Sequence, residues 1–177
     1  MIVSMLKFLI AAIAILALLF GPMIYAEYQL GAKIANIQTQ ADKTVTPFKV
    51  FRPPTASVEA LTNYTKVQMA ITGDGVVYYY GKSEYAPDLI EPNSLLIIQH
   101  VYIPNASGGG FETEKNGQKY FYFSLNGLRT LVFSKNTNYA NPTEINLILA
   151  GTLGAGVKLD DEPEYSKKMI GIAESMH

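Results

Sequence analysis

The sequence predicts an α+β protein with a long N-terminal transmembrane and amphipathic helix, an antiparallel β-meander sheet and a short C-terminal helix. Three observations predict it: an opening run without charge, alternating segments joined by Asn-Gly pairs, and a final segment with apolar residues three or four positions apart. We expect a transmembrane anchor or signal segment over 1–27, an amphipathic helix and Pro-rich linker over 28–56, and an extracytoplasmic antiparallel sheet domain over 57–177.

The opening segment is long enough to cross a bilayer. Residues 8–26 carry no charge, and about 20 apolar residues span the hydrocarbon core as a helix. One interpretation is a secretory signal cleaved after Ala26, which would release a secreted or periplasmic domain. The other is a retained anchor, which we favour because Ile24 occupies a position where cleavage requires a small residue. Lys7 precedes the span, so the N-terminus is expected in the cytoplasm and the C-terminal domain outside it.

The anchor is expected to continue as an amphipathic helix to about Lys43. Tyr25 and Tyr28 suit the membrane–water boundary, and Pro22 is expected to kink the helix because proline removes a backbone hydrogen bond. The positions with helical spacing beyond the boundary are Leu30, Ile34, Ile37 and Ala41. Prolines at 47, 53 and 54 then prevent further helix, which predicts a linker or an extended edge.

A short helix followed by strands is expected over the rest of the chain. Ser57 to Thr65 suits one or two helical turns with Ser57 as the N-cap. Asn116-Gly117 and Asn126-Gly127 are the dipeptides preferred in two-residue hairpin turns. The expected strands of an antiparallel sheet of five to seven strands are 66–72, 76–81, 95–104, 111–115, 118–125, 128–134 and 144–150.

Four consecutive aromatic residues, YFYF, occupy the middle of the expected strand 118–125. Because side chains alternate along a strand, Tyr120 and Tyr122 face one side, while Phe121, Phe123 and Leu125 face the other. One side can fill the core, which leaves a tyrosine surface for a carbohydrate, a lipid or a partner protein. The aromatic run lacks the glycine alternation of RNA-recognition strands.

The C-terminal segment is expected to be a helix that begins near Pro163. Proline suits the first turn, and acidic residues suit the positive helix N-terminus. Its apolar stripe is Tyr165, Met169, Ile172 and Met176. Helix-start acidity also explains the acidic cluster Asp160, Asp161, Glu162 and Glu164, whose spacing matches no calcium-binding loop.

The chain shows no catalytic, cofactor or metal motif. It has no cysteine, and neither His100 nor His177 lies in a GxSxG or HExxH pattern. GTLGAG at 151–156 lacks the lysine and hydroxyl residue of a phosphate loop. The net charge of −1 argues against a nucleic-acid partner. We therefore expect no enzyme and no cofactor, although two carboxylates that meet in the fold would still permit a membrane-bound hydrolase.

Residues 11–37, AAIAILALLFGPMIYAEYQLGAKIANI, resemble the first helix of type IV pilins. The resemblance implies an apolar helix with an internal proline, followed by tyrosines and an amphipathic half packed under an antiparallel sheet. Pro22, Tyr25 and Tyr28 occupy corresponding places. The start of the helix differs from that family, because Met5 and Lys7 lie there and no glutamate does.

These features together favour a non-catalytic, membrane-anchored structural or assembly subunit of a pilus, a secretion machine or another membrane complex. The expected partners are membrane lipid and other protein subunits. The expected contact residues are Pro22, Tyr25, Tyr28, Ile34, Ile37, Tyr120 and Tyr122. The alternative is a periplasmic or extracellular ligand-binding or sensing domain.

Overall fold

The structure is a computed structural model that describes residues 25, 28–29, 31–44, 46–64, 66–72, 75–83, 91–102, 111–125, 127–151 and 163–177. The chain divides into two compact units, Met1–Asn36 and Ile37–His177. The second unit contains the whole described sheet, so residues 37–56 belong with the sheet domain in this division. Pro22 and most of the expected span 8–26 lie outside the described residues.

The described part of the first unit is helical. Tyr25, Tyr28, Gln29 and residues 31–36 are in helix, and this helix runs on to residue 41 in the second unit. Tyr25 and Tyr28 are both exposed, and the Gln29 side-chain amide donates to the Tyr25 hydroxyl at 2.9 Å. Among the described residues, no helix has the length and apolar character needed to cross a membrane.

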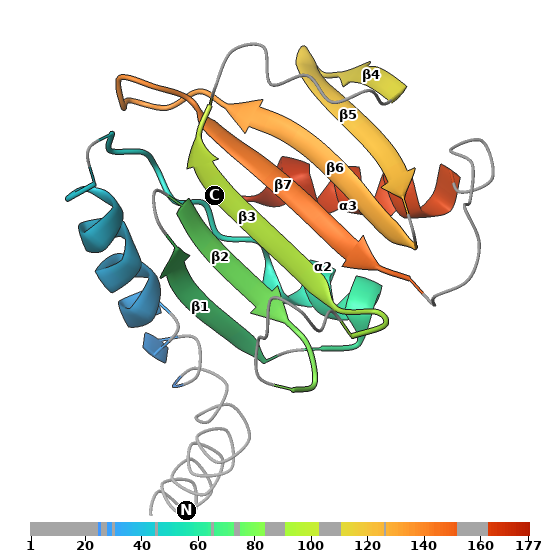
Figure 1. Ribbon diagram of the computed structural model, residues 1–177, viewed down its shortest axis with the longest axis horizontal. Coiled ribbons are helices and arrows are strands. Elements are labelled where there is room, and N and C mark those ends of the chain that lie inside the picture. Colours follow the sequence, from blue (N-terminus) through green and yellow to red (C-terminus); the bar gives the residue numbers. More distant parts are fainter. Residues whose placement is uncertain are drawn as a thin grey trace, which may run out of the picture. The chain divides into compact units, whose positions relative to one another are not determined.

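The second unit is an α+β domain built on one antiparallel sheet, as the sequence predicts (Figure 1). The sheet has seven strands in the order β1-β2-β3-β7-β6-β5-β4. The strands are β1 (Val67–Thr72), β2 (Gly75–Tyr80), β3 (Leu95–Val101), β4 (Phe111–Lys115), β5 (Gln118–Leu125), β6 (Leu128–Lys135) and β7 (Thr143–Ala150).

Two meanders meet at the centre of the sheet. Strands β1 to β3 form one and β4 to β7 the other, and they join where β3 pairs with β7. The β4–β5 turn has the conformation that its Asn-Gly pair predicts, with φ of 54° at Asn116 and 75° at Gly117. Gly127 also has a positive φ, 78°, whereas Asn126 lies outside the described residues.

Two helices cover one face of the sheet, which we call the inner face (Figure 1). Helix α2 (Thr55–Thr62) follows Pro54, and no side chain caps it. The prediction that Ser57 is the N-cap is therefore wrong, because the helix begins two residues earlier. Helix α3 (Pro163–Ser175) begins where the sequence predicts. The α3 side of the core contains Met169, Ile172, Ala173 and Met176.

The strap, residues 48–51, lies extended across the inner face and is part of the core. Phe48, Val50 and Phe51 are all buried, so the segment predicted as a linker or an extended edge is extended but packs in the core. Side chains, and not a neighbouring strand, hold this backbone. Gln38 donates to the Phe48 carbonyl at 2.9 Å and accepts from the Val50 N–H at 2.8 Å.

Two sheet residues hold the strap from the other side. The Thr143 hydroxyl on β7 donates to the Lys49 carbonyl at 2.8 Å. The Gln99 amide on β3 accepts from the Phe51 N–H at 2.7 Å and donates to the Phe51 carbonyl at 2.8 Å. The extended backbone is thus satisfied although proline interrupts its sequence nearby.

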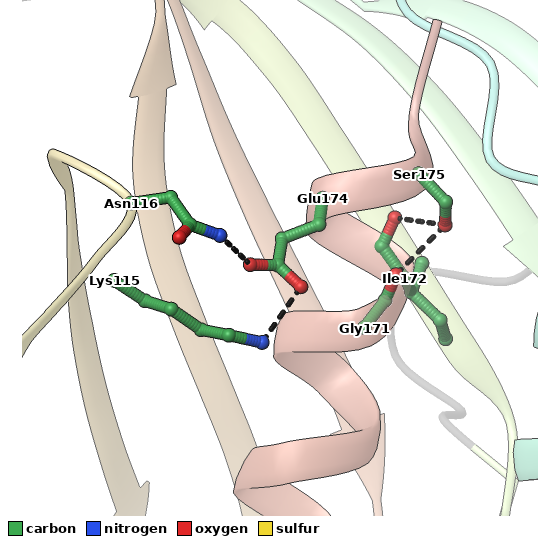
Figure 2. Close-up of polar contacts among 6 residues, drawn as sticks. All are labelled: Lys115, Asn116, Gly171, Ile172, Glu174 and Ser175. Atoms are coloured by element: carbon green, nitrogen blue, oxygen red, sulfur yellow. Dashed lines mark hydrogen bonds and ion pairs between the residues drawn. The ribbon is translucent and has the colours of Figure 1, made fainter.

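The β4–β5 turn is tied to α3 by polar contacts (Figure 2). The Lys115 ammonium lies 2.8 Å from one Glu174 carboxylate oxygen, and the Asn116 amide donates to the other at 3.2 Å. At the helix end, the Ser175 hydroxyl donates to the carbonyls of Gly171 and Ile172 at 2.7 and 2.9 Å. These contacts fix the outermost hairpin against the helix that covers the inner face.

Candidate functional site on the outer face of the sheet

The opposite face of the sheet, which we call the outer face, is the candidate site. Neither α2 nor α3 packs on it, because their buried side chains belong to the inner-face core. The pairing register and strand alternation place on it Val77, Tyr79, Leu96, Ile98, His100, Phe121, Phe123, Thr130, Val132, Glu144, Asn146 and Ile148.

Most of the outer face is apolar and only partly buried. Val77, Tyr79 and Leu96 form a small buried cluster, against which the partly exposed Ile98 and Ile148 pack. Phe121, Phe123 and Val132 are half-buried on the neighbouring strands. Partly exposed apolar side chains gathered on one face of a sheet mark a contact site on many proteins.

A glutamate fixes the end of the outer face next to Tyr79. The Glu91 carboxylate accepts from the Ser83 hydroxyl, from the backbone N–H groups of Lys82 and Ser83 at 2.8 and 3.1 Å, and from the Tyr79 hydroxyl at 3.3 Å. These hydrogen bonds, led by that of the Ser83 side chain, lower the pKa of Glu91 to about 2. Glu91 therefore holds the chain after β2 as an anion across the neutral pH range.

A polar cluster lies among these apolar residues, at the junction of the two meanders. His100 on β3 is directly opposite Glu144 on β7, and Asn146 follows two positions later on the same face. Three of their atoms form a triangle with equal sides. His100 Nε2, Glu144 Oε1 and Asn146 Nδ2 are each 3.4 Å from the other two.

The His100 ring is oriented by its own strand. Its Nδ1 atom lies 2.9 Å from the Val101 carbonyl. A carbonyl only accepts, so Nδ1 carries the proton that is donated, and in the corresponding neutral tautomer Nε2 presents a lone pair to the cluster. The Glu144 side chain is only 12% exposed and that of His100 30%, so the cluster is reached from solvent on the histidine side.

Two other acidic groups that the structure describes are paired with lysines. Glu112 lies 2.7 Å from the Lys119 ammonium on the sheet surface. Glu164 lies 2.7 Å from Lys168, and Asp160, Asp161 and Glu162 fall outside the described residues. Within the described ranges, no group of three or more His, Cys, Asp or Glu side chains is placed to hold a metal.

The prediction that Tyr120 and Tyr122 form an exposed surface is wrong. Tyr120 and Tyr122 are 2% and 1% exposed, because their side of β5 is the inner face that α3 and the strap cover. The outward side carries Phe121 and Phe123 instead. Ile37 is also a core residue. Of the remaining expected contact residues, Tyr25 and Tyr28 are exposed and Ile34 is partly exposed in the first unit.

Sequence reasoning placed His100 in an apolar strand and missed its partners. The detectable signal was the presence of polar residues in two apolar strands. His100 lies near the end of LLIIQHV, and Glu144 and Asn146 alternate with apolar residues in TEINLILA. Each is unremarkable alone, since polar residues commonly mark the exposed side of a strand. The cluster exists only because β3 pairs with β7.

Comparison with protein-family models, with curated proteins and with solved structures finds no significant match for this chain.

Proposed function

We propose that this protein is a non-catalytic, membrane-anchored assembly subunit whose outer face contacts another protein subunit. The observation that carries the proposal is a row of partly exposed side chains across β3, β7, β6 and β5. Its members are Ile98, Asn146, Val132 and Phe121, of which three are apolar. Burying such side chains against a partner stabilises a complex by about 25 cal/mol per Å² of apolar surface before the losses of association are subtracted.

The membrane attachment in this proposal comes from the sequence. Residues 8–26 have no charge. The chain divides after Asn36, so the residues from 27 to 36 belong to the same unit as this apolar segment and not to the sheet unit. A tether of this kind holds a subunit at a bilayer while its folded body meets its neighbours. The sheet unit would then lie outside the cytoplasm, in keeping with Lys7 before the span.

The test is co-purification from native membranes in a mild detergent. We expect the wild-type chain to elute with other subunits, and Val132→Lys to lose them because it places a charge in the contact. Asn138→Lys, at an exposed position after β6, is the matched control and should retain them. A wild-type chain that elutes as a lone monomer, or a Val132→Lys chain that keeps all its partners, would contradict the proposal.

The His100–Glu144–Asn146 cluster favours a second candidate, an extracytoplasmic ligand-binding or sensing domain. Its three polar groups converge on one point beside an apolar surface, which is typical of a small-ligand site. A ligand screen by thermal shift on the full chain tests this candidate, since a ligand that binds only the folded state raises the melting temperature. A screen that changes the wild-type and His100→Gln chains equally would remove it.

A further inference from the structure

We propose that His100, Glu144 and Asn146 form a binding site for a divalent transition-metal ion of the zinc class. The inference does not depend on the assembly role. Asn146 lies between Ile98 and Val132 on the same face, but the test of this inference measures metal binding instead of co-purification.

The spacing of the three atoms is that of ligands around one ion, once the Asn146 amide is turned so that its oxygen takes the place of Nδ2. All three separations are 3.4 Å, whereas N–H···O hydrogen bonds cluster at about 2.9 to 3.0 Å. Zinc ligands in proteins lie about 2.0 to 2.2 Å from the metal in a tetrahedron. Two ligands at that distance and at the tetrahedral angle are about 3.3 to 3.6 Å apart, so the triangle has the dimensions of one face of the tetrahedron.

The histidine is prepared as a ligand. With the Nδ1 proton donated to the Val101 carbonyl, Nε2 carries the lone pair and points toward a carboxylate oxygen. The lone pair on Nε2 and that carboxylate oxygen are close enough to coordinate one cation together. A backbone carbonyl on the other ring nitrogen is also the common outer-shell partner of metal-binding histidines.

The donor set selects the class of metal. Glu144 supplies an anionic oxygen, and Asn146 supplies a neutral oxygen once its amide turns by half a rotation, which exchanges the positions of Oδ1 and Nδ2. Imidazole nitrogen favours zinc, copper, nickel or iron over calcium and magnesium, which prefer oxygen ligands. The partly exposed histidine side leaves the fourth position to water.

The residues paired with the three ligands are uncharged, apart from the ligands themselves. Opposite His100 on β2 is Gly75, which has no side chain. On the other side of β7, Ser134 of β6 pairs with Glu144, and Val132 of β6 pairs with Asn146. No lysine or arginine is directly paired with these three residues in the described register.

The test is zinc titration of the full chain in a non-ionic detergent by isothermal calorimetry at pH 7.5, after treatment with a chelator. We expect one site with a micromolar or lower Kd, and a loss of at least about tenfold in affinity in His100→Gln. The matched control is His177→Gln, which removes the only other histidine of a chain without cysteine and should bind like the wild type. Asn146→Asp adds a second carboxylate and should bind more tightly.

Circular dichroism and thermal melting without metal establish that each variant is folded. In the wild type, zinc should shift the His100 Nε2 resonance while Nδ1 keeps its proton. The proposal is overturned if the wild type shows no site, if His100→Gln binds as the wild type does, or if His177→Gln alone abolishes binding. A lone imidazolium–carboxylate pair would give the first of these results.

Discussion

The side-chain amide of Gln99 makes both of its hydrogen bonds to the backbone of one residue, Phe51, at 2.7 and 2.8 Å. Gln99 is fully buried, with 0% exposure, so no water replaces either bond. The amide thus satisfies the N–H and the carbonyl of Phe51, as the backbone of a neighbouring strand does elsewhere in the sheet. The stability of the domain should therefore depend on this one polar side chain in an apolar strand.

Gln99→Met should lower the free energy of unfolding by about 3 kcal/mol, because it leaves the N–H and the carbonyl of Phe51 buried without partners. Chemical denaturation measures the change. The matched control is Gln118→Met, since the Gln118 side chain donates only an exposed bond to the Lys119 carbonyl, and it should change stability by less than about 0.5 kcal/mol. Equal effects of the two substitutions would contradict the role given to Gln99.

Tyr78→Phe should leave the free energy of unfolding unchanged or raise it by about 1 kcal/mol. Among the described residues, the Tyr78 hydroxyl is a buried polar group without a hydrogen-bond partner, so its removal loses no bond. Tyr79→Phe, on the adjacent residue, removes the bond to Glu91 and should be mildly destabilising. A clear loss of stability in Tyr78→Phe would show that the hydroxyl has a partner.

Tyr78 also predicts that the stability of the domain depends on pH in the alkaline range. Burial, followed by the charge of Tyr80, raises the pKa of Tyr78. The folded state then holds the phenol proton more tightly than the unfolded state, whose pKa is about 10. Stability should be constant below pH 10 with respect to this group and fall above it. Melting temperatures from pH 8 to 11 should decline less steeply in Tyr78→Phe than in the wild type.

Glu91→Gln should lower the melting temperature at neutral pH, because a neutral amide is a weaker acceptor for the Ser83 and Lys82 donors. The folded pKa of Glu91 is lowered to about 2 from an ordinary value of 4.5. The stabilisation is therefore complete above about pH 4.5 and is lost as the pH falls toward 2. Melting curves of the two proteins should converge near pH 2, and a constant difference at all pH values would contradict this account.

Gly81→Ala should lower the free energy of unfolding, because it disturbs the packing at the end of the outer face. A Cβ atom on Gly81 would lie 2.4 Å from two atoms of the Tyr79 side chain, and that side chain is buried. The ring must move, which weakens its bond to Glu91. Overpacking of this kind costs about 1 to 3 kcal/mol, measurable by denaturation. Gly31→Ala is the control, because nothing lies within 4 Å of a Cβ at that position.

Short-range signals predicted most of the sheet. The Asn116-Gly117 pair predicted the turn between β4 and β5, because the two central residues of such a turn need positive φ, as both residues have here. Alternation in β5 separated its tyrosines from its phenylalanines correctly. It did not indicate which side would be covered, because that depends on where α3 and the strap pack, and both kinds of ring are apolar enough for a core.

Long-range contacts account for what the sequence did not reveal. Prolines predicted a linker near residue 50, since no local pattern shows that Gln38 and Gln99 will bind that backbone. The metal-ligand triangle was equally hidden, because His100 and Glu144 belong to different meanders and become neighbours only through the β3–β7 pairing. Local spacing carries no trace of either arrangement.

The β3–β7 pairing also has a consequence for the order of folding. Every other pair of adjacent strands in the sheet is consecutive in the chain, so a modest loop-closure entropy suffices to form each meander. Joining the two requires ordering a segment that contains three further strands, which is the slow kind of step in β-rich proteins. His100 and Glu144 lie on this seam, so their convergence should accompany the last and slowest kinetic phase of refolding.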